Sequence, residues 1–439
     1  MNLDADKYIS KLRSGRIEHV KGRLASVVGL TLEAVLPGTF IGEQVEILSR
    51  TRPALRAEVV GFKRDVAILM PLGDPSGLGP GSEVVPTGEE PSVSCGPALQ
   101  GRVLDGLGRA LDGRGLPGGL VRVPLYRNAP PALRRIPVDR SLTLGVRVLD
   151  GLLTAGEGQR LGLFAAAGVG KSTLLAQVAK NTSADVIVLA LVGERGREVR
   201  EFIDHALGVE GLGRSVVVCA TSDEPALVRK RAAYTATAIA EYFRDQGKRV
   251  LLLLDSLTRV ARAQREIGLA AGEPPVRRGF PPSSFAMLPG LLERAGNSDK
   301  GTMTAIYTVL VEGDDQDEPV SDEVRGILDG HIILSRNLAS RGRWPAVDVL
   351  GSLSRVFDKV AEPGQVEGAA KLRALLSSYE QKRELILLGA YKHGSDPMVD
   401  MAIELMPRIE SYLVQGKTER SDMKTAVSGL LELTDWDWS

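Results

Sequence analysis

The sequence predicts an α/β protein in which a mostly parallel central sheet joins a small N-terminal β-barrel and a C-terminal helical domain. Three observations support this prediction. Short runs of alternating hydrophobicity fill the first part of the chain, apolar runs alternate with helical segments in the middle, and leucines at helical spacing dominate the end. We therefore expect domains over residues 1–91, 92–357 and 358–439.

Length and composition are those of a globular protein with more than one domain. The 439 residues suggest about three domains, at roughly 150 residues each. The apolar share of 43% and the charged share of 25% are ordinary for a soluble protein. The 55 basic and 55 acidic residues cancel, which argues against nucleic acid as the main partner, because nucleic-acid-binding domains are usually basic.

Targeting and redox signals favour the cytoplasm. The chain starts without the apolar stretch of a signal peptide, and its longest apolar runs, such as 186–192 and 250–254, fall far short of the ~20 residues of a membrane helix. Cys95 and Cys219 are far apart, so they form neither a disulfide framework nor a metal-binding spacing. We expect a protein of the reducing cytoplasm.

The first domain reads as a series of short strands. The stretch RIEHVKGRLASVVGLTLEAVL alternates, and GEQVEILS, LRAEVVGF and DVAILMPL follow it after Gly, Pro and Asp turns. Strands of this length and spacing predict a small barrel or sandwich, of which we favour the barrel. Before it, Tyr8, Ile9 and Leu12 fit either a short amphipathic helix or a frayed tail over residues 1–14.

The middle and the end of the chain differ from this pattern. Residues 111–137 are dense in Gly, Pro and Arg and predict an irregular connector. From residue 142, runs such as DVIVLALVG, SVVVCAT, RVLLLLD and MTAIYTVLV fit parallel strands buried on both faces. From about residue 358 the chain turns helical, with Leu372, Leu375, Leu376 and Tyr379 at helical spacing and further helices over 398–414 and 422–433.

Residues 165–173, AAAGVGKST, fit the phosphate-binding P-loop pattern if Ala replaces its first Gly. The loop follows a predicted strand and opens a predicted helix, so backbone N–H groups and the helix N-terminus would point at the phosphates. Lys171 would reach the β and γ phosphates, and Ser172 would bind Mg²⁺. The alternative is a simple strand-to-helix turn. The candidate phosphate-binding residues are Ala165, Ala166, Ala167, Gly168, Val169, Gly170, Lys171, Ser172 and Thr173.

Two carboxylates also follow apolar strands. Asp255 ends RVLLLLD, as in a Walker B motif, and paired with the P-loop it is a candidate Mg²⁺ ligand rather than a helix cap. Glu194, in LVGERGREVREF, is a candidate to orient and deprotonate the attacking water. Phosphoryl transfer also needs cations near the γ-phosphate, for which Arg195 and Arg259 are candidates. The alternative for this second segment is a solvated charged loop.

Taken together, these motifs give the chain a resemblance to a known family. It resembles the catalytic subunits of rotary ATP synthases and, more closely, the type III secretion and flagellar export ATPases. The matching stretches occur in order from about residue 15 to the C-terminal helices. They are LDGLLTAGEGQRLGLFAAAGVGKSTLL, LVGERGREVREF, AEYFRDQGKRVLLLLDSLTRVARAQREIGLAAGEPP, RRGFPPSSFAMLPGLLERAG, YTVLVEGDDQDEPVSDEVRGILDGHIILSR and WPAVDVLGSLSR. The resemblance implies a RecA-like P-loop core that uses ATP and Mg²⁺.

The resemblance also implies roles for single residues. Glu194 matches the catalytic glutamate, and Asp255 matches the Walker B carboxylate. Lys171, Arg195 and Arg259 would contact the γ-phosphate. Two further matches come from WPAVDVLGSLSR: Arg355 is the arginine finger that reaches the neighbouring subunit's site, and Trp344 stands where relatives carry an aromatic residue beside the adenine.

One chain carries both the catalytic Glu194 and the finger Arg355, so a single chain type can build every active site of a ring, and we expect a homohexamer. By resemblance, loops 272–284 and 312–319 would contact a central coiled-coil stalk; the alternative is plain exposed turns. The N-terminal segment would bind a peripheral stator that holds the ring at the inner membrane, next to the export gate. The C-terminal helices would face export chaperones and cargo.

Three other functions fit the sequence less well than an export ATPase of flagellar or injectisome type. A rotary ATP synthase-type catalytic subunit is the nearest alternative, but SLTRVARAQREIGLAAGEPP is closer to the export ATPases. A hexameric RNA helicase of the terminator type needs stacking aromatics and a basic groove near its N-terminus, where this chain has only Tyr8, Phe40 and Phe62 as aromatics. A regulatory nucleotide-binding subunit generally lacks the catalytic carboxylate, whereas Glu194 is present.

Overall fold

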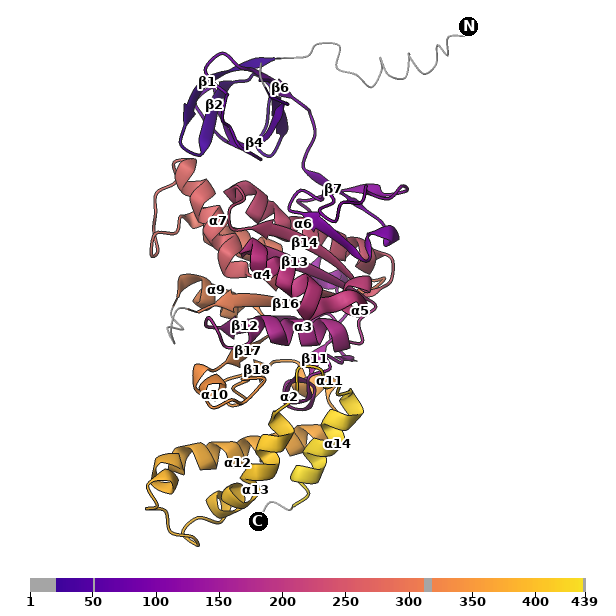
Figure 1. Cartoon of the computed structure of the whole chain (residues 1–439), viewed down its shortest axis with the longest axis vertical. Coiled ribbons are helices and arrows are strands. Elements are labelled where there is room, and N and C mark those ends of the chain that lie inside the picture. The colour runs from indigo at the N-terminus through magenta and orange to yellow at the C-terminus, as the bar shows by residue number, and fades with distance from the viewer. Residues whose placement is uncertain (1–20, 50–51, 312–317, 437–439) are drawn as a thin grey trace.

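The computed structural model describes residues 21–49, 52–311 and 318–436, and it arranges them as three parts along one long axis (Figure 1). A barrel lies at one end, an α/β domain in the middle and a helical domain at the other end. The predicted fold class is confirmed. The helix considered for residues 1–14 lies outside the described residues.

The N-terminal part is a closed antiparallel barrel with the strand order β1-β2-β5-β4-β3-β6. Alternating side chains fill its interior, as with Val45 and Ile47 of β3. Gly22 is required where the barrel closes, because a Cβ there would lie 2.2 Å from the Val35 carbonyl oxygen. The strands are β1 (Gly22–Val28), β2 (Thr31–Val35), β3 (Gln44–Ile47), β4 (Leu55–Lys63), β5 (Val66–Pro71) and β6 (Glu83–Pro86).

The central part is an eight-stranded sheet with the order β18-β17-β12-β16-β15-β13-β14-β8. All neighbouring strands run parallel except β17 and β18. The carboxyl ends of the parallel strands therefore meet at one edge of the sheet. The strands are β8 (Arg102–Asp105), β12 (Arg160–Ala165), β13 (Val186–Glu194), β14 (Ser215–Thr221), β15 (Arg249–Asp255), β16 (Thr302–Leu310), β17 (Gly330–Leu334) and β18 (Leu353–Ser354).

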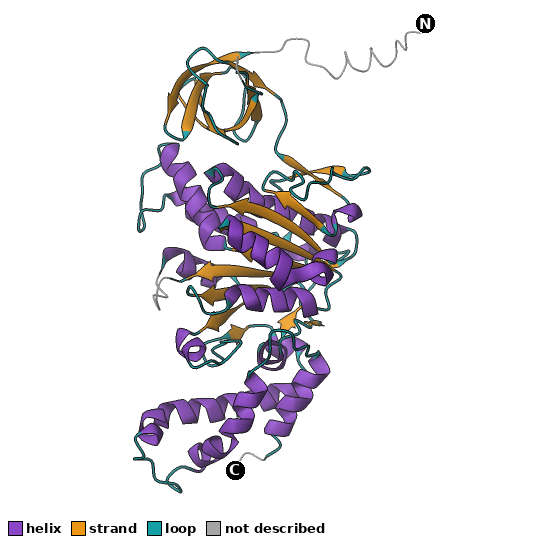
Figure 2. Ribbon diagram, in the orientation of Figure 1, coloured by secondary structure: helices purple, strands orange, loops and turns teal. Residues whose placement is uncertain are grey.

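Helices cover both faces of this sheet, which explains why its strands are apolar throughout (Figure 2). In β13, Val188 and Ala190 join the core under α6 and α7, while Ile187 and Leu189 join the core under α3. The helices are α2 (Arg147–Leu152), α3 (Lys171–Asn181), α4 (Gly196–Glu201), the π-helix Phe202–Leu207, α5 (Gly208–Gly213), α6 (Ala226–Asp245), α7 (Leu257–Ala270), α8 (Pro282–Leu292), α9 (Pro319–Ile327), α10 (Arg336–Ser340) and α11 (Phe357–Val360).

The connector expected over residues 111–137 is less irregular than the sequence suggests. β9 (Val121–Pro124) lies within the expected connector and pairs with β7 (Ser92–Cys95), and a 3-10 turn spans Ala132–Arg134. The Gly- and Pro-rich composition hides this strand because only Val121 and Val123 give it an apolar alternation. A short pair, β10 (Ser141–Leu142) with β11 (Ala155–Gly156), follows.

The C-terminal part consists of α12 (Pro363–Leu387), α13 (Pro397–Leu413) and α14 (Met423–Leu433). Leu372, Leu375 and Leu376 are buried in the same core as α2, so this part packs directly on the central domain. Asp396 and Asp422 cap α13 and α14 by accepting hydrogen bonds from backbone N–H groups. Among the described residues, the structure contains no helix that is long and apolar enough to cross a membrane.

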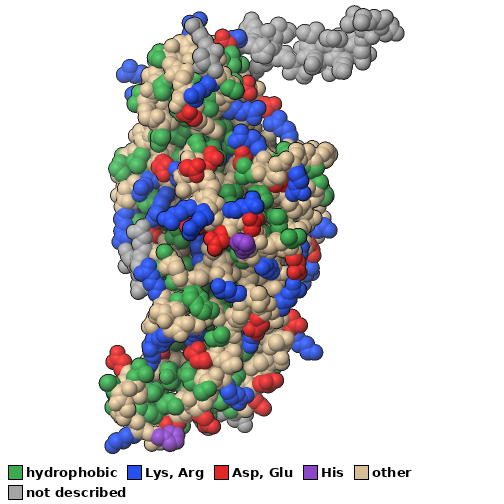
Figure 3. Space-filling model, in the orientation of Figure 1, with side chains coloured by type: hydrophobic (Ala, Val, Ile, Leu, Met, Phe, Trp, Pro, Cys, Tyr) green, Lys and Arg blue, Asp and Glu red, His purple; other side chains and the backbone are tan. Residues whose placement is uncertain are grey.

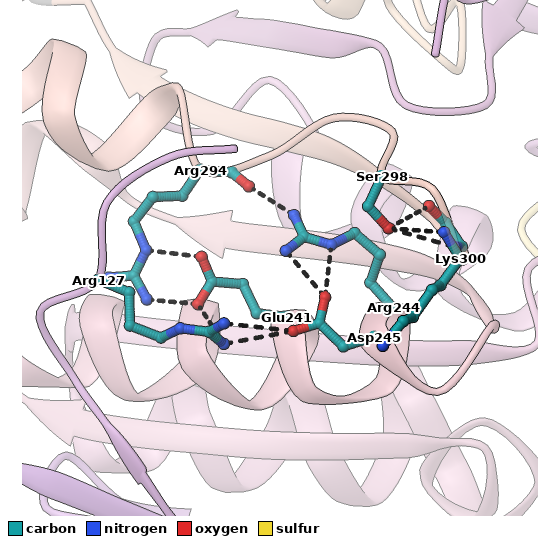
Figure 4. A network of polar contacts seen from close by, with 8 residues as sticks. Arg127, Glu241, Arg244, Asp245, Arg294, Ser298 and Lys300 are labelled. Atoms are coloured by element: carbon teal, nitrogen blue, oxygen red, sulfur yellow. Dashed lines mark hydrogen bonds and ion pairs between the residues drawn. The ribbon is translucent and has the colours of Figure 1, made fainter. Parts of the chain in front are cut away.

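Buried ion pairs connect the parts. Arg231 of α6 pairs with Glu58 of the barrel, and both side chains are almost fully buried. Deeper in the domain, Arg294 makes a bidentate pair with Glu241 of α6 at 2.8 and 2.7 Å (Figure 4). Arg294 also donates to the Leu125 carbonyl at 2.7 Å. This network fixes the connector that leaves β9 onto the central domain.

Candidate active site

The P-loop leaves the carboxyl end of β12 and enters α3 at Lys171, as predicted. Gly168 and Gly170 have φ angles of 81° and 84°, a backbone conformation that favours glycine. At Gly170 space is also limiting, because a Cβ there would lie 2.6 Å from Cζ3 of Trp344. The loop therefore keeps a shape in which backbone N–H groups precede a helix N-terminus, which suits the binding of an anion.

A cavity of about 520 Å³ lies beside this helix N-terminus, within the usual size range of ligand pockets. Its walls come from α3, from the ends of β13 and β15, from the π-helix and from the loop between α13 and α14. The lining residues are Ser172, Thr173, Ala176, Gln177, Lys180, Leu191, Glu194, Glu198, Val199, Glu201, Phe202, His205, Ala206, Asp255, Lys417 and Thr418. The predicted acidic residues and part of the predicted P-loop thus share one cavity.

Lys171 lies between the two predicted carboxylates. Its ammonium group bonds Oδ1 of Asp255 and is 3.4 Å from Oε1 of Glu194. Asp255 is buried, and the Thr308 hydroxyl donates to its Oδ1 at 2.7 Å. One cation therefore compensates two largely desolvated carboxylates, which would otherwise be costly to bury.

Glu194 is also held from the other side by Arg259 of α7. The Arg259 Nη1 atom is 2.8 Å from Oε2 of Glu194 and also donates to the Gly193 carbonyl. Gly193 has a φ angle of 70°, and a Cβ there would lie 2.8 Å from Cδ of Arg259. A glycine before the acidic residue therefore gives Arg259 room to reach it.

The structure does not bring Arg195 into this cluster. Arg195 precedes α4, its side chain is 80% exposed, and it lies 3.5 Å from Glu198. Trp344, by contrast, lies against the P-loop at Gly170 and is partly exposed. Of the predicted cations, Lys171 and Arg259 therefore contact Glu194, and Arg195 faces solvent.

Arg355 lies at the opposite edge of the sheet. It follows β18, whose Ser354 pairs with Gly330 at the amino end of β17, and its backbone N–H donates to the Asp329 carbonyl at 2.9 Å. The P-loop continues from the other end of the β12–β17 pair, where Ala165 pairs with Leu334. Gly330 and Leu334 are four residue steps apart, which corresponds to about 13 Å of strand. The exposed Arg355 is therefore remote from the cavity of its own chain.

The residues around the cavity suit a magnesium–nucleotide. Ser172 and Asp255 both line it, and Mg²⁺ prefers few protein ligands together with phosphate oxygens. No cluster of three or more His, Cys, Asp or Glu side chains suited to a metal exists in the described part of the chain.

Sequence reasoning missed some residues at the site. Thr308 contacts Asp255 from the neighbouring strand β16, and Lys417 and Thr418 reach the cavity from the α13–α14 loop. This loop is fixed over α3, because Gln177 donates to the Gly416 carbonyl at 3.2 Å. The sequence around Thr308, Lys417 and Thr418 contains no motif that predicts this placement.

Charge on the surface agrees with the balanced composition. Figure 3 shows basic and acidic side chains interspersed over the visible face, rather than a continuous basic strip.

Comparisons with known proteins cover all three parts of the chain. The nucleotide-binding domain of the ATP synthase alpha/beta family matches residues 145–354, and the beta-barrel domain of the same family matches residues 24–88. The C-terminal domain of the T3SS EscN ATPase matches residues 361–432.

Relatives match over almost the whole length. A flagellum-specific ATP synthase of Bacillus subtilis is 51% identical, over 94% of this chain and 95% of the relative. A type 3 secretion system ATPase of Xanthomonas euvesicatoria is 52% identical, over 94% of both chains. The assembled ATPase EscN of enteropathogenic E. coli is similar in structure, with a TM-score of 0.89, 45% identity and coverage of 94% of this chain and 100% of EscN. EscN with its central stalk EscO gives a TM-score of 0.87 at 44% identity, with the same coverage.

Proposed function

Because the chain belongs to the ATP synthase alpha/beta family, together with flagellum-specific ATP synthases and type 3 secretion system ATPases, we propose that it hydrolyses ATP to energise type III protein export. The observation that carries the proposal is the convergence of three groups beside the P-loop: Glu194 and Asp255 line one cavity, and Lys171 contacts both of them. These are the groups that ATP hydrolysis needs for charge neutralisation, water activation and metal binding. The enzyme is an ATPase.

Each residue of the site has its own role in this reaction. The phosphates lie on the backbone of residues 165–173, and Lys171 turns from Asp255 toward the γ-phosphate. Ser172 and Asp255 would hold Mg²⁺, which would supply positive charge next to the phosphates. Glu194 orients a water molecule and takes its proton as the water attacks the γ-phosphorus and ADP leaves.

Cations then stabilise the charge that develops on the transferred phosphoryl group. Arg259 stabilises this charge directly, and it also orients Glu194 through their 2.8 Å contact. Arg195 is the third cation of this group, and its side chain turns from solvent toward the γ-phosphate once nucleotide is bound. Trp344, beside Gly170, provides a stacking face for the adenine.

Arg355 acts on the next subunit. It lies at the amino edge of the sheet, away from its own cavity, so it reaches a γ-phosphate only in a neighbouring copy. A head-to-tail contact of this kind closes into a ring, and a homohexamer is the expected assembly. The solved relative EscN in its assembled form supports this reading.

The partners proposed for this protein are those of its family. The complex of EscN with its central stalk EscO supports a coiled-coil stalk in the ring of this protein as well. Loop 272–284 is one contact with that stalk; the second expected loop, 312–319, lies mostly outside the described residues. A peripheral stator on the N-terminal segment, chaperones and cargo at the C-terminal helices, and an export gate complete the set. The ring works in the cytoplasm, peripherally at the inner membrane.

The experiment measures ATPase rate against protein concentration for the natural chain and for Arg355→Ala. A site shared between copies predicts that the specific activity of the natural chain rises cooperatively with concentration. Arg355→Ala should lose about 10³-fold in kcat at every concentration, as expected for an arginine finger. Arg408→Ala removes an exposed arginine of α13 and serves as the matched control. Full activity of Arg355→Ala would refute the shared site, and stimulation by RNA would favour a helicase.

A further inference from the structure

The chain around Arg355 alternates between buried and exposed residues. Ser354 and Val356 are buried, whereas Leu353 and Arg355 are exposed. An exposed arginine has many rotamers, so the region that its guanidinium can reach depends on where the backbone beneath it is fixed. The residues that fix this backbone therefore determine where the proposed finger can act.

Hydrogen bonds fix the backbone at Arg355. Its N–H donates to the Asp329 carbonyl at 2.9 Å. The side-chain amide of Gln159, which is fully buried, donates to the same carbonyl at 3.1 Å and to Oγ of Ser354 at 3.0 Å. The Ser354 hydroxyl donates in turn to the Thr154 carbonyl at 3.1 Å. Asp329 is therefore the residue to which the backbone of Arg355 is directly bonded.

Arg160 holds Asp329 through its side chain and its backbone. Its Nε and Nη2 atoms donate to Oδ2 and Oδ1 of Asp329, each at 3.0 Å, and its backbone N–H donates to Oδ2 at 3.0 Å. The Asp329 N–H donates back to the Arg160 carbonyl at 2.9 Å. The Arg160 side chain is only 14% exposed and also pairs with Glu293. A bidentate pair of this kind fixes geometry as well as contributing energy.

The strand that precedes Arg355 is too short to fix the finger by itself. β18 contains two residues, and it pairs with β17 at only those two positions. Arg160, by contrast, is the first residue of β12, which pairs with β16 along its whole length and with β17 over four residues. The pair of Arg160 and Asp329 therefore attaches the backbone of Arg355 to a well-paired strand inside the sheet.

We propose that Arg160 is a positioning residue for ATP hydrolysis: by holding Asp329, it keeps the backbone of Arg355 where the finger reaches the γ-phosphate in a neighbouring copy. The inference rests on the proposed function, because Arg355 must act on a cavity other than its own. Arg160 does not line the cavity of its own chain. Its loss should therefore damage the site to which the chain contributes its finger and spare the site to which it contributes Glu194.

The first test records steady-state ATPase kinetics and the ADP-induced change in tryptophan fluorescence for Arg160→Met in the full chain. This variant should lose about 10²-fold in kcat, because a displacement of about 1 Å in a catalytic group can cost this much. Its KM for ATP and its response to ADP should match those of the natural chain, because its own cavity is intact. Arg160→Lys keeps the charge without the bidentate geometry and should lose less.

Arg249→Met is the matched control. Arg249 is likewise the first residue of a parallel strand of this sheet, β15. Its Nη2 atom donates to Oδ1 of Asp185 at 2.8 Å, and its backbone N–H donates to Oδ2 at 2.9 Å. The control thus removes the same kind of ion pair from the same edge of the sheet, away from the finger. Its kcat should stay within about twofold of that of the natural chain.

Mixed assemblies distinguish a positioning role from a general structural defect. In an equimolar mixture of Arg160→Met and Glu194→Gln, some sites combine the correctly held Arg355 of one variant with the intact Glu194 of the other. The specific activity of the mixture should therefore rise severalfold above the mean of the two variants measured alone. Arg355→Ala mixed with Glu194→Gln should behave in the same way. Asp255→Asn mixed with Glu194→Gln should stay at the mean, because both changes damage the cavity of their own chain.

The outcomes separate this inference from the proposed function. A natural kcat in Arg160→Met, or a loss of its response to ADP, would overturn the positioning role. So would a mixture with Glu194→Gln that stays at the mean while the Arg355→Ala mixture rises, and the shared site would then stand without Arg160. If neither mixture rose above the mean, the shared site itself would be refuted, and the positioning role with it.

Discussion

Oε2 of Glu194 lies 2.8 Å from Nη1 of Arg259, and the same nitrogen donates to the carbonyl of Gly193, the residue before Glu194. A side chain of α7 thus fixes both the backbone and the carboxylate at the end of β13. In the proposed mechanism, the direction in which Glu194 presents its oxygen to water therefore depends on Arg259. On that proposal, loss of Arg259 affects the orientation of the base as well as the charge near the γ-phosphate.

Arg259→Ala should lower kcat by about 10²–10³, the usual cost of removing one charge-stabilising donor. The KM for ATP should change less, because the P-loop backbone and Lys171 remain. Steady-state ATPase assays over a range of ATP concentrations measure both. Arg262→Ala, on the same helix, should stay within about twofold of the natural chain. An Arg259→Ala enzyme with normal kcat would remove Arg259 from the mechanism.

Glu194→Gln should abolish turnover while leaving ATP binding intact. The amide keeps the shape of the side chain but takes no proton from water, and general base catalysis contributes about 10²–10⁴ in rate. Binding of a fluorescent ATP analogue, measured beside the ATPase rate, separates the two effects. If turnover survived in this variant, another residue would have to be the base.

Removal of Mg²⁺ should stop hydrolysis, and Asp255 should determine how much metal is required. Asp255→Asn keeps the hydrogen bond from the Thr308 hydroxyl but lacks the charge that pairs with Lys171 and that, in the proposed mechanism, binds the metal. We expect a loss of about 10²–10³ in kcat, together with a higher Mg²⁺ concentration for half-maximal activity. A chelator titration of the natural chain and a Mg²⁺ titration of the variant test this. An unchanged Mg²⁺ requirement in Asp255→Asn would place the metal elsewhere.

Trp344 should report nucleotide binding. Its ring contacts the P-loop at Gly170, so ADP should change the intrinsic fluorescence of the natural chain but not that of Trp344→Phe. Trp344→Ala should weaken ADP binding about tenfold, since stacking on a base contributes about 1–3 kcal/mol. The KM for ATP should rise with kcat nearly constant. Trp436→Phe is the control, which should keep the ADP-induced change in fluorescence.

Much of the site follows from one property of the sequence, the burial of parallel strands on both faces. Because Ala165, Glu194 and Asp255 each end such a strand, the sequence alone predicts that they meet at one edge of the sheet. The barrel and the C-terminal helices were equally predictable from the sequence. Apolar residues recur at every second position in the strands of the barrel and about every 3.6 positions in the C-terminal helices.

Other parts of the site depend on tertiary structure that no local pattern reveals. Arg195 and Glu194 are adjacent in sequence, yet the start of α4 directs Arg195 to solvent while Arg259 reaches Glu194 from a different helix. Lys417 reaches the cavity only because Gln177 holds its loop over α3.

The buried pair of Arg294 and Glu241 gives a prediction about stability (Figure 4). Both side chains are 1% exposed, so Arg294→Met would leave a carboxylate without its bidentate partner. Breaking such a pair typically costs about 3–5 kcal/mol. Arg127, 3.5 Å from Oε2 of Glu241, compensates part of this loss and favours the lower end of the range.

Denaturant unfolding of the natural chain and of Arg294→Met measures the difference. The double variant Arg294→Met, Glu241→Met should recover most of the lost stability, because no charge then remains buried without a partner. Arg420→Met breaks an exposed pair with Glu210 of 2.8 Å and should cost less than about 1 kcal/mol. Equal losses for Arg294→Met and Arg420→Met would contradict the argument, because a buried carboxylate left without its partner should cost far more than an exposed one.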